Sequence, residues 1–466
     1  MDMLDKAQSA AGDYSRGIWS KLAMLQNAGD PLTLLLQIAR NRRGCIPLQM
    51  GSQRVFLLTA AEQFKQVLAT NSANYGKYLE GMTPIFGRSM ITMDGALWQK
   101  MRAIQQPAFH PDALAEYVPH LLSAIDARIA RWRELDGAVV DIGPEMWGLA
   151  VDMICKALFD RETPFNPYFV YNAVEAFTTV TNHGSVGKFG EAPPPLRAQN
   201  NGGDATDDAI AYATGVWDTL PELVLSAPPF QNRERTFLKM VEAAAADPAI
   251  GEFDRSQVID EIKQYIWAGT ETTALVLTWA LYLLAKHPEV ADQIRHETDS
   301  ICGDRTPTLA DFERLSFTRS VVSETMRMYP PIWSLARSAE GTDVIDGQQV
   351  QAGDIVMLWV YVAHHDPRYW DDPLSFDPKR FGERTKAPAP YTYLPFGGGK
   401  RACIGTTMSQ IEMVLALSRV LREFNLHCVG GPPGVKLSVV LSPNSRVPLR
   451  LERRSNAGAT RVATGI

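Results

Sequence analysis

The sequence predicts a mainly helical protein with small β-sheets, an α+β fold class. Residues 92 to 330 show mostly helical periodicity, whereas short β-patterned segments gather near the two ends of the chain. A helix from about Arg255 to Lys286 far exceeds the ~11–12 residues of an average helix, so we expect it to cross the core. The sequence contains no internal repeat.

The strand predictions rest on β-rich segments bounded by turn residues. The first is a hairpin around Gly51 and Ser52, and the second turns at Asp346 and Gly347. The predicted strand regions are residues 46–59, 343–350, 355–362, 435–441 and 447–451, the last two joined by residues 442–445.

The ends of the long central helix are predicted from capping residues. Asp254 and Gln257 form a capping-box pattern at its start. Lys286 and His287 suit the negative end of the helix dipole, and Pro288 stops the helix.

We expect one domain across residues 1–466, with a core at about 45–452. The length of 466 residues alone would suggest two or three domains. Residues 191–208, rich in Pro, Asn and Gly, form either a plain linker or a mobile lid. We favour a flexible lid over about 167–230, because the helices on either side have no separate cores. Residues 455–466 have the composition of a disordered tail.

Composition excludes several function classes. The net charge of −6 and the pI of about 5.8 argue against a nucleic-acid binder. The five cysteines are odd in number and form no CxxC pair, which favours a reducing compartment. No apolar run reaches the ~18–20 residues of a membrane span. We therefore expect a soluble, cytoplasmic monomer without a transmembrane anchor.

The most informative segment is residues 396–405, where a glycine-rich loop precedes a helix that starts near Cys403. Free N–H groups and the dipole at a helix start favour a thiolate, which is a good ligand for a metal ion. Arg401 can pair with an anionic group, and Gly405 leaves room for a flat ring against the helix. The alternative is an inert buried cysteine after an ordinary turn.

This segment resembles the proximal haem loop of the cytochrome P450 family, Phe-x-x-Gly-x-Arg-x-Cys-x-Gly. The fixed positions are matched by Phe396, Gly399, Arg401, Cys403 and Gly405. The resemblance implies a haem-thiolate monooxygenase with haem b, held between the long central helix and the cysteine loop. Cys403 would be the iron ligand, and its thiolate would favour O–O cleavage.

A second resemblance lies in the central helix at residues 268–273, where a glycine and three threonines weaken the helix. The Thr272 hydroxyl can bond back to the carbonyl of Ala268 and bend the helix. In the family, an acid–alcohol pair at this place delivers protons, and Glu271 and Thr272 match it. The alternative is a buried helix whose threonines only bond back.

Charged residues elsewhere match further family motifs. Glu324 and Arg327 lie one helical turn apart and would join Arg380 in a buried ionic triad that fixes the cysteine loop; alone, such a pair is usually a surface ion pair. Trp98 and Arg102 resemble a motif that binds a haem propionate. The other implied haem contacts are Arg337, Phe396, Arg401 and Gly405; the alternative for each arginine is an ordinary surface residue.

The resemblance implies an enzyme that inserts one oxygen atom from O2 into an apolar small molecule, such as a terpenoid, fatty acid or polyketide. The chain carries no flavin, nicotinamide or iron–sulfur motif, so a separate ferredoxin or flavodoxin with its reductase must supply electrons. The predicted docking residues, which are equally typical of solvated helix surface, are Lys100, Arg128, Arg131, Arg133 and Lys400. The predicted substrate pocket comprises Tyr78, Leu79, Met82, Ile85, Phe86, Trp267, Ala268, Trp333, Pro443 and Asn444.

Two other functions compete with this one. A peroxide-driven hydroxylase uses no redox partner, and a haem-binding sensor has no turnover. The Glu271–Thr272 pair disfavours both, because peroxide-driven relatives typically lose this pair and haem binding alone does not require it.

Overall fold

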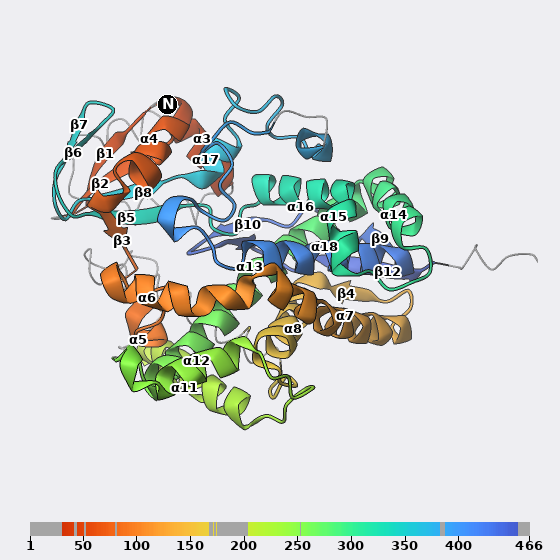
Figure 1. Cartoon of the computed structure of the whole chain (residues 1–466). Coiled ribbons are helices and arrows are strands. Elements are labelled where there is room, and N and C mark those ends of the chain that lie inside the picture. The colour runs from red at the N-terminus through yellow and green to blue at the C-terminus, as the bar shows by residue number, and fades with distance from the viewer. Residues whose placement is uncertain are drawn as a thin grey trace, which may run out of the picture.

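A computed structural model describes residues 30–41, 44–50, 53–79, 82–166, 171, 174, 204–251, 253–382 and 387–454. Most of these residues are helical (Figure 1). The α-helices are α3 Pro31–Asn41, α4 Ala61–Lys65, α5 Thr83–Phe86, α6 Gly95–Gln105, α7 Pro111–Glu134, α8 Ile142–Ile154, α11 Asp204–Ser226, α12 Phe237–Ala246, α13 Arg255–Lys286, α14 Pro288–Cys302, α15 Leu309–Arg314, α16 Ser316–Met328, α17 Val360–His364 and α18 Thr406–Glu423.

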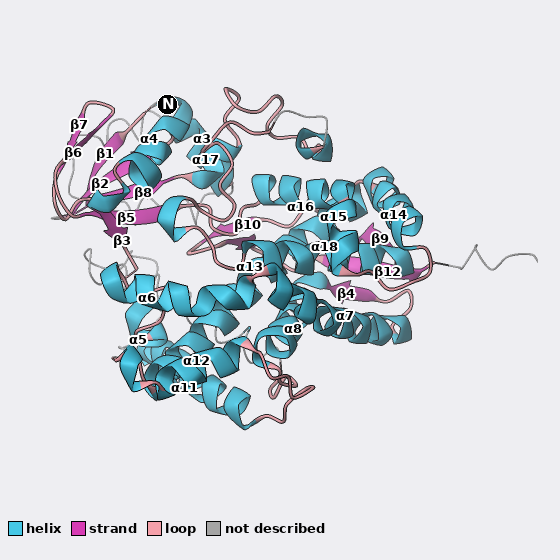
Figure 2. Cartoon of the chain, in the orientation of Figure 1, coloured by secondary structure: helices cyan, strands magenta, loops and turns pink. Residues whose placement is uncertain are grey.

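The strands form four small sheets, and Figure 2 shows the largest of them at one side of the helices. The largest has the order β1-β2-β8-β5-β3, with strands β1 Ile46–Met50, β2 Gln53–Leu58, β8 Ile355–Leu358, β5 Leu335–Ala339 and β3 Tyr75–Lys77. The three others pair β6 Asp343–Ile345 with β7 Gln348–Val350, β10 Val435–Leu437 with β11 Leu441–Pro443, and β12 Pro448–Arg453 with both β4 Val139–Asp141 and β9 Phe424–Cys428.

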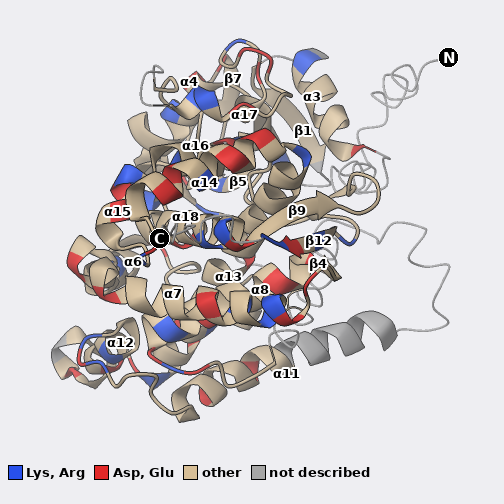
Figure 3. Ribbon diagram, turned by 90° about the vertical axis from the view of Figure 1, so that its right-hand side faces the viewer, with Lys and Arg blue, Asp and Glu red and all other residues tan. Residues whose placement is uncertain are grey.

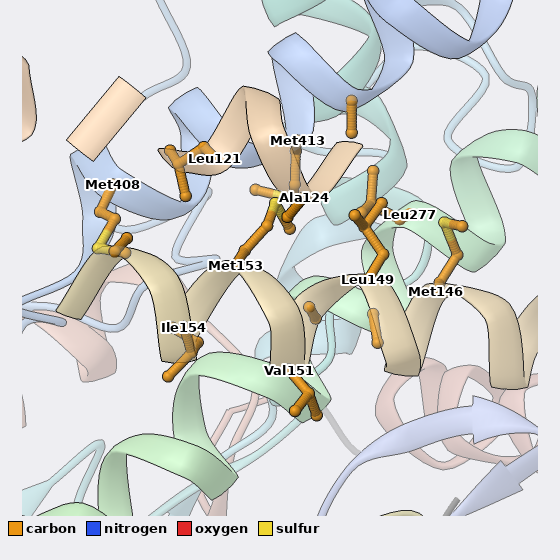
Figure 4. Close-up of a cluster of buried hydrophobic side chains, with 14 of the residues drawn as sticks. Leu121, Ala124, Met146, Leu149, Val151, Met153, Ile154, Leu277, Met408 and Met413 are labelled. Carbon is orange, nitrogen blue, oxygen red and sulfur yellow. The ribbon is translucent and has the colours of Figure 1, made fainter. Parts of the chain in front are cut away.

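Helix α13 crosses the middle of the molecule, as the sequence predicts (Figure 1). Asp254 caps its first turn with Gln257 in a capping box, and the helix ends at Lys286 before Pro288. Apolar side chains of α8 pack between α7, α13 and α18 (Figure 4). Examples are Leu149 and Met153 of α8 beside Leu277 of α13 and Met413 of α18, all fully buried. Burying such side chains stabilises the fold by about 1.5–3 kcal/mol each.

The predicted fold class is confirmed, but two strand predictions are wrong in part. The segment 355–362 is a strand only as far as Leu358, because the next residues form α17 and bury their side chains. That helical turn lets the His364 ring accept a hydrogen bond from the N–H of Leu394, at 2.8 Å. The segments 435–441 and 447–451 do not pair with each other. The first folds back on itself as β10 and β11, while β12 pairs with β4 and β9, whose strand character the sequence pattern missed.

Two predicted features lie largely or wholly outside the described residues. The first is the lid, in which residues 167–170, 172–173 and 175–203 are not described. The second is the tail at residues 455–466. No helix in the described ranges is long and apolar enough to cross a membrane. Basic and acidic positions are interspersed along the helices in the side view (Figure 3).

Candidate active site

The cysteine loop is a tight turn held by its own backbone. The Cys403 N–H donates to the carbonyl of Phe396 at 2.9 Å, and a short 3₁₀ turn, Gly399–Arg401, lies between them. Gly399 has a φ of 66°, and a Cβ there would overlap the carbonyl oxygen of Leu68. Only glycine therefore lets the loop approach this backbone so closely. Helix α18 follows directly, with Gly405 as its N-cap residue.

The residue Cys403 is exposed, whereas Cys45, Cys155 and Cys302 are buried. Burial among protein atoms nevertheless raises the pKa of the Cys403 thiol, and the N–H of Gly405 and the charge of Arg102 only partly offset this increase. The predicted effect of the helix start therefore has the right sign but is smaller than the effect of desolvation. A bound metal cation would reverse the balance, since a coordinating thiol is deprotonated.

Four cations gather beside this loop and form what we call the cation cluster: Lys77, Arg102, Arg337 and Arg401. Burial lowers the pKa of Arg337 and of Arg401 to about 10 and also lowers that of Arg102. The pKa of Lys77 falls to about 7, first because of burial and then because of Arg401 and Arg337. These lowered pKa values mean that keeping the four side chains positively charged costs free energy in the folded protein.

The hydrogen bonds of the cation cluster go mainly to neutral acceptors. Arg102 donates to the Ala402 carbonyl at 3.0 Å, and Arg337 donates to the Ala336 carbonyl at 2.8 Å. Arg401 lies 3.7 Å from the centroid of the Trp98 ring and pairs with Asp94. Asp94 is the one carboxylate that the described residues place in an ion pair with this cluster. The cluster therefore suits an anionic ligand.

The sequence predicted three of the four cations and Trp98 but missed Lys77 and Asp94. Lys77 lies opposite Arg337 in the β3–β5 register, 260 positions apart in the chain. No local motif marks Lys77, so only the fold reveals it.

The predicted proton-delivery pair lies in the middle of α13. The Thr272 hydroxyl donates to the Ala268 carbonyl at 2.8 Å, as the threonine pattern predicts. Glu271 is 5% exposed and borders a cavity of about 320 Å³ together with Trp147, Pro443 and Asn444. Successive residues of a helix point in different directions, so the two side chains lie on different faces of α13.

Sequence analysis missed a second buried acid beside α13. Glu412 of α18 accepts a hydrogen bond from the Thr273 hydroxyl at 3.2 Å, and burial raises its pKa to about 8. It lies on the helix that follows Cys403, but a single glutamate among apolar residues gives no signal before the fold is known.

The predicted ionic triad is brought together and is buried. Glu324 lies 2.7 Å from Arg327 and 3.3 Å from Arg380, and the side chains of Glu324 and Arg327 are fully inaccessible. Arg327 also donates to the carbonyls of His364, Pro373 and Ser375. The geometry is that of an internal brace and not of a surface ion pair.

The predicted pocket residues divide among three groups. Phe86 contacts Trp267 with a centroid distance of 5.1 Å, and Met82 and Ile85 belong to the same core cluster, against which Leu79 and Ala268 pack. Trp333 lies in another cluster, against which Tyr78 packs. Pro443 and Asn444 line the cavity beside Glu271 instead.

The predicted docking face is wrong at Arg128. This side chain is 8% exposed and pairs with Glu145 at 2.7 Å and with Asp152 at 3.4 Å. It braces α7 against α8, so it cannot meet a partner. Arg131 and Arg133 are more exposed, but each pairs with a glutamate.

Comparison with known proteins places this site in a family. The family model for cytochrome P450 matches residues 16–447. The chain belongs to the cytochrome P450 family. It is 30% identical to cyclooctatin synthase of Streptomyces melanosporofaciens, over 86% of this chain and 88% of the relative. It is 28% identical to pentalenene oxygenase of Streptomyces avermitilis, over 88% of this chain and 90% of the relative.

A solved structure described as the haem domain of cytochrome P450DA superposes with a TM-score of 0.79 and 24% identity, covering 92% of this chain and 94% of that one. That likeness shows the cytochrome P450 fold. The protein is thus a cytochrome P450 monooxygenase, and its family implies a haem cofactor and the use of O2.

The residues of this P450 fit a haem. Cys403 offers an exposed thiol residue, and the cation cluster offers buried and partly buried positive charges with one carboxylate among them. A Cβ added at Gly405 would lie 3.9 Å from the Cys403 sulfur and from Phe109, an ordinary van der Waals distance, so no atom of the described residues crowds this face of the loop. An iron ligand and cationic hydrogen-bond donors for carboxylate groups therefore lie together, beside a glycine that the described part of the chain leaves uncrowded.

Proposed function

We propose that the protein inserts one atom of O2 into an apolar small molecule and that a separate ferredoxin or flavodoxin, with its reductase, supplies the electrons. The observation that carries the proposal is the exposed residue Cys403 beside four cations that are buried or partly buried. Relatives named cyclooctatin synthase and pentalenene oxygenase favour a terpenoid over a fatty acid or polyketide as substrate. We further propose haem b as the form of the cofactor. That the chain is a cytoplasmic monomer stays a prediction.

Each part of the site has a distinct task in this proposal. The bound haem would supply the activation of O2 and the oxidation itself. Cys403 would hold the iron, while Arg102, Arg337 and Arg401 would pair with the haem carboxylates. The apolar side chains of Phe86 and Trp267 would exclude water from the substrate.

Proton transfer is assigned to Glu271 and Thr272. The Thr272 hydroxyl, which donates to the Ala268 carbonyl in the middle of α13, would supply a proton where O2 is activated. Glu271 borders a cavity and would replace that proton from water that enters there. A positioned proton donor contributes about 10²–10⁴-fold to the rate of such a step.

The test compares product and hydrogen peroxide per reductant consumed, with a terpenoid that shifts the haem spectrum on binding. In Thr272→Ala we expect normal haem binding and continued reductant consumption, with much of the reductant now lost as hydrogen peroxide. Added peroxide should partly restore product. The control is Thr298→Ala, which removes the same kind of back-bond from α14, where the hydroxyl donates to Ile294 at 2.8 Å.

An unchanged product yield in Thr272→Ala would remove Thr272 from the mechanism. Equal turnover by the wild-type protein with peroxide alone would favour the peroxide-driven hydroxylase instead.

A further inference from the structure

The segment between α5 and α6 is held by side chains of α13. Three backbone N–H groups of residues 88–91 donate to side chains of three residues that lie within about one turn of each other in the first half of α13. Arg88 donates to Asp260 at 2.8 Å, Met90 to Glu261 at 2.7 Å, and Ile91 to Gln264 at 2.5 Å. Glu261 is 0% exposed and Gln264 is 3% exposed, so water competes little for these bonds.

The same segment is held from its other side by Lys77. The Lys77 ammonium donates to the carbonyls of Met90 and Ile91, at 3.3 and 2.9 Å. Met90 and Ile91 therefore have both the N–H and the C=O of their backbone bound by side chains from two different elements. Because Lys77 belongs to the cation cluster, the segment connects that cluster with α13.

Gly87 shows that the contact with α13 depends on a specific residue. It has a φ of 51°, and a Cβ at this position would overlap the carboxylate of Asp260. Any other residue would therefore be strained and would displace the Asp260 carboxylate, which accepts the hydrogen bond from the N–H of Arg88.

The segment builds part of the apolar wall that we assign to the substrate pocket. Phe86, directly before it, packs against Trp267 of α13 and Trp217 of α11. Met90 and Met93 are 7% and 6% exposed and belong to the same core cluster as Phe86. A shift of the backbone at residues 87–93 would therefore change the shape of the pocket.

We propose that Asp260, Glu261, Gln264 and Lys77 act as a two-sided clamp on residues 87–93 and so determine which substrates the pocket accepts. These are positioning residues, because they bind the backbone of the wall and not the substrate. The role in specificity rests on the proposed haem pocket, whereas the clamp itself does not.

The test uses Glu261→Leu and Gln264→Leu in the full-length, haem-loaded protein. Loss of one buried hydrogen bond should speed amide hydrogen exchange at Met90 and Ile91 by about tenfold. Glu261→Gln keeps an acceptor oxygen and should stay close to wild type. Lys263→Gln is the matched control on the same turn of α13, because Lys263 pairs with Asp218 of α11 and not with the segment.

Specificity is read from the dissociation constants of a small and a bulky azole, followed in the haem spectrum. We expect their ratio to change in the two leucine variants and to stay constant in Glu261→Gln and Lys263→Gln. Unchanged exchange in Gln264→Leu, or an equal change in Lys263→Gln, would overturn the clamp, even if Glu261→Leu does not fold. Faster exchange with a constant azole ratio would overturn the role in specificity. Failure of the wild type to bind haem would reject the proposed function, while the exchange rates would still decide the clamp.

Discussion

The ionic triad and the cation cluster are both groups of buried or partly buried charges, but they are built in opposite ways. In the triad, the Glu324 carboxylate accepts hydrogen bonds from Arg327, from Arg380 and from the N–H of Asp377. The remaining donors of the two arginines go to backbone carbonyls. In the cation cluster, one of the four positive side chains, Arg401, forms an ion pair, and its partner is Asp94.

The difference separates a structural site from a ligand site. Buried charges that pair with one another hold together the loops that carry them. Removing one partner leaves the other charges buried and unpaired, which destabilises the fold. Buried charges of one sign weaken the fold until an opposite charge arrives. Mutations in the two groups should therefore have opposite effects on the protein without its cofactor.

The largest effect is expected in the triad. Glu324→Ala leaves the charges of Arg327 and Arg380 without their carboxylate, which should cost about 3–5 kcal/mol in the free energy of unfolding. We expect little soluble, haem-loaded protein, measured as yield and haem content. The control is Glu313→Ala, which breaks an exposed pair with Arg319 and should change stability by less than about 1 kcal/mol. Normal yield and haem content in Glu324→Ala would show that the triad does not brace the fold.

A smaller effect, of the opposite kind, is expected in the cation cluster. Arg337→Gln removes one of four like charges, so the cofactor-free protein should be as stable as wild type or more stable. Haem should dissociate about 10–100-fold faster, since a hydrogen bond to a charged group contributes about 1.5–3 kcal/mol. The measurement is the rate of haem transfer to a scavenging protein.

The matched control for this experiment is Arg54→Gln in the same sheet, where Arg54 already pairs with Asp354 at 3.1 Å. An unstable Arg337→Gln protein with unaltered haem release would make the cation cluster structural, like the triad.

The smallest effect concerns pH and Lys77. The pKa of Lys77 is lowered to about 7 in the fold, whereas an unfolded lysine titrates at about 10.4. Between these values the unfolded chain binds more protons, so the free energy of unfolding should fall as the pH drops towards 7. The slope is at most about 1.4 kcal/mol per pH unit.

Urea unfolding of the cofactor-free protein at pH 9 and pH 7 measures this slope. Lys77→Met should lose part of the pH dependence. The same pH dependence in both proteins would show that Lys77 is not under the positive potential of the cation cluster.

The comparison also shows what the sequence can predict. The ends of α13 follow from Asp254, Gln257 and Pro288, because capping is chemistry between near neighbours in the chain. The cysteine loop and the pair at Glu271 and Thr272 are equally local. These features were predicted as motifs within ten residues; the structure confirms the ends of α13 and the bond of Thr272 to Ala268, whereas the catalytic and haem-binding roles stay predictions.

The features that sequence analysis missed depend on distant residues. Lys77 joins the cation cluster because β3 pairs with β5, and Arg128 leaves the surface because α8 supplies Glu145. Strand β12 pairs with β9, an interaction that a local hydrophobic pattern cannot specify. In each case the tertiary contact, and not the local pattern, decides the environment of the side chain.

The central claim is that Cys403 ligates the haem iron, and the reduced carbon monoxide spectrum tests it most directly. The thiolate-specific red shift should be present in the wild type and in Cys428→Ser, which changes a half-buried cysteine of β9. It should be lost in Cys403→Ser, which keeps the shape of the loop but replaces the sulfur. Survival of the red shift in Cys403→Ser, or its loss in Cys428→Ser alone, would contradict the account.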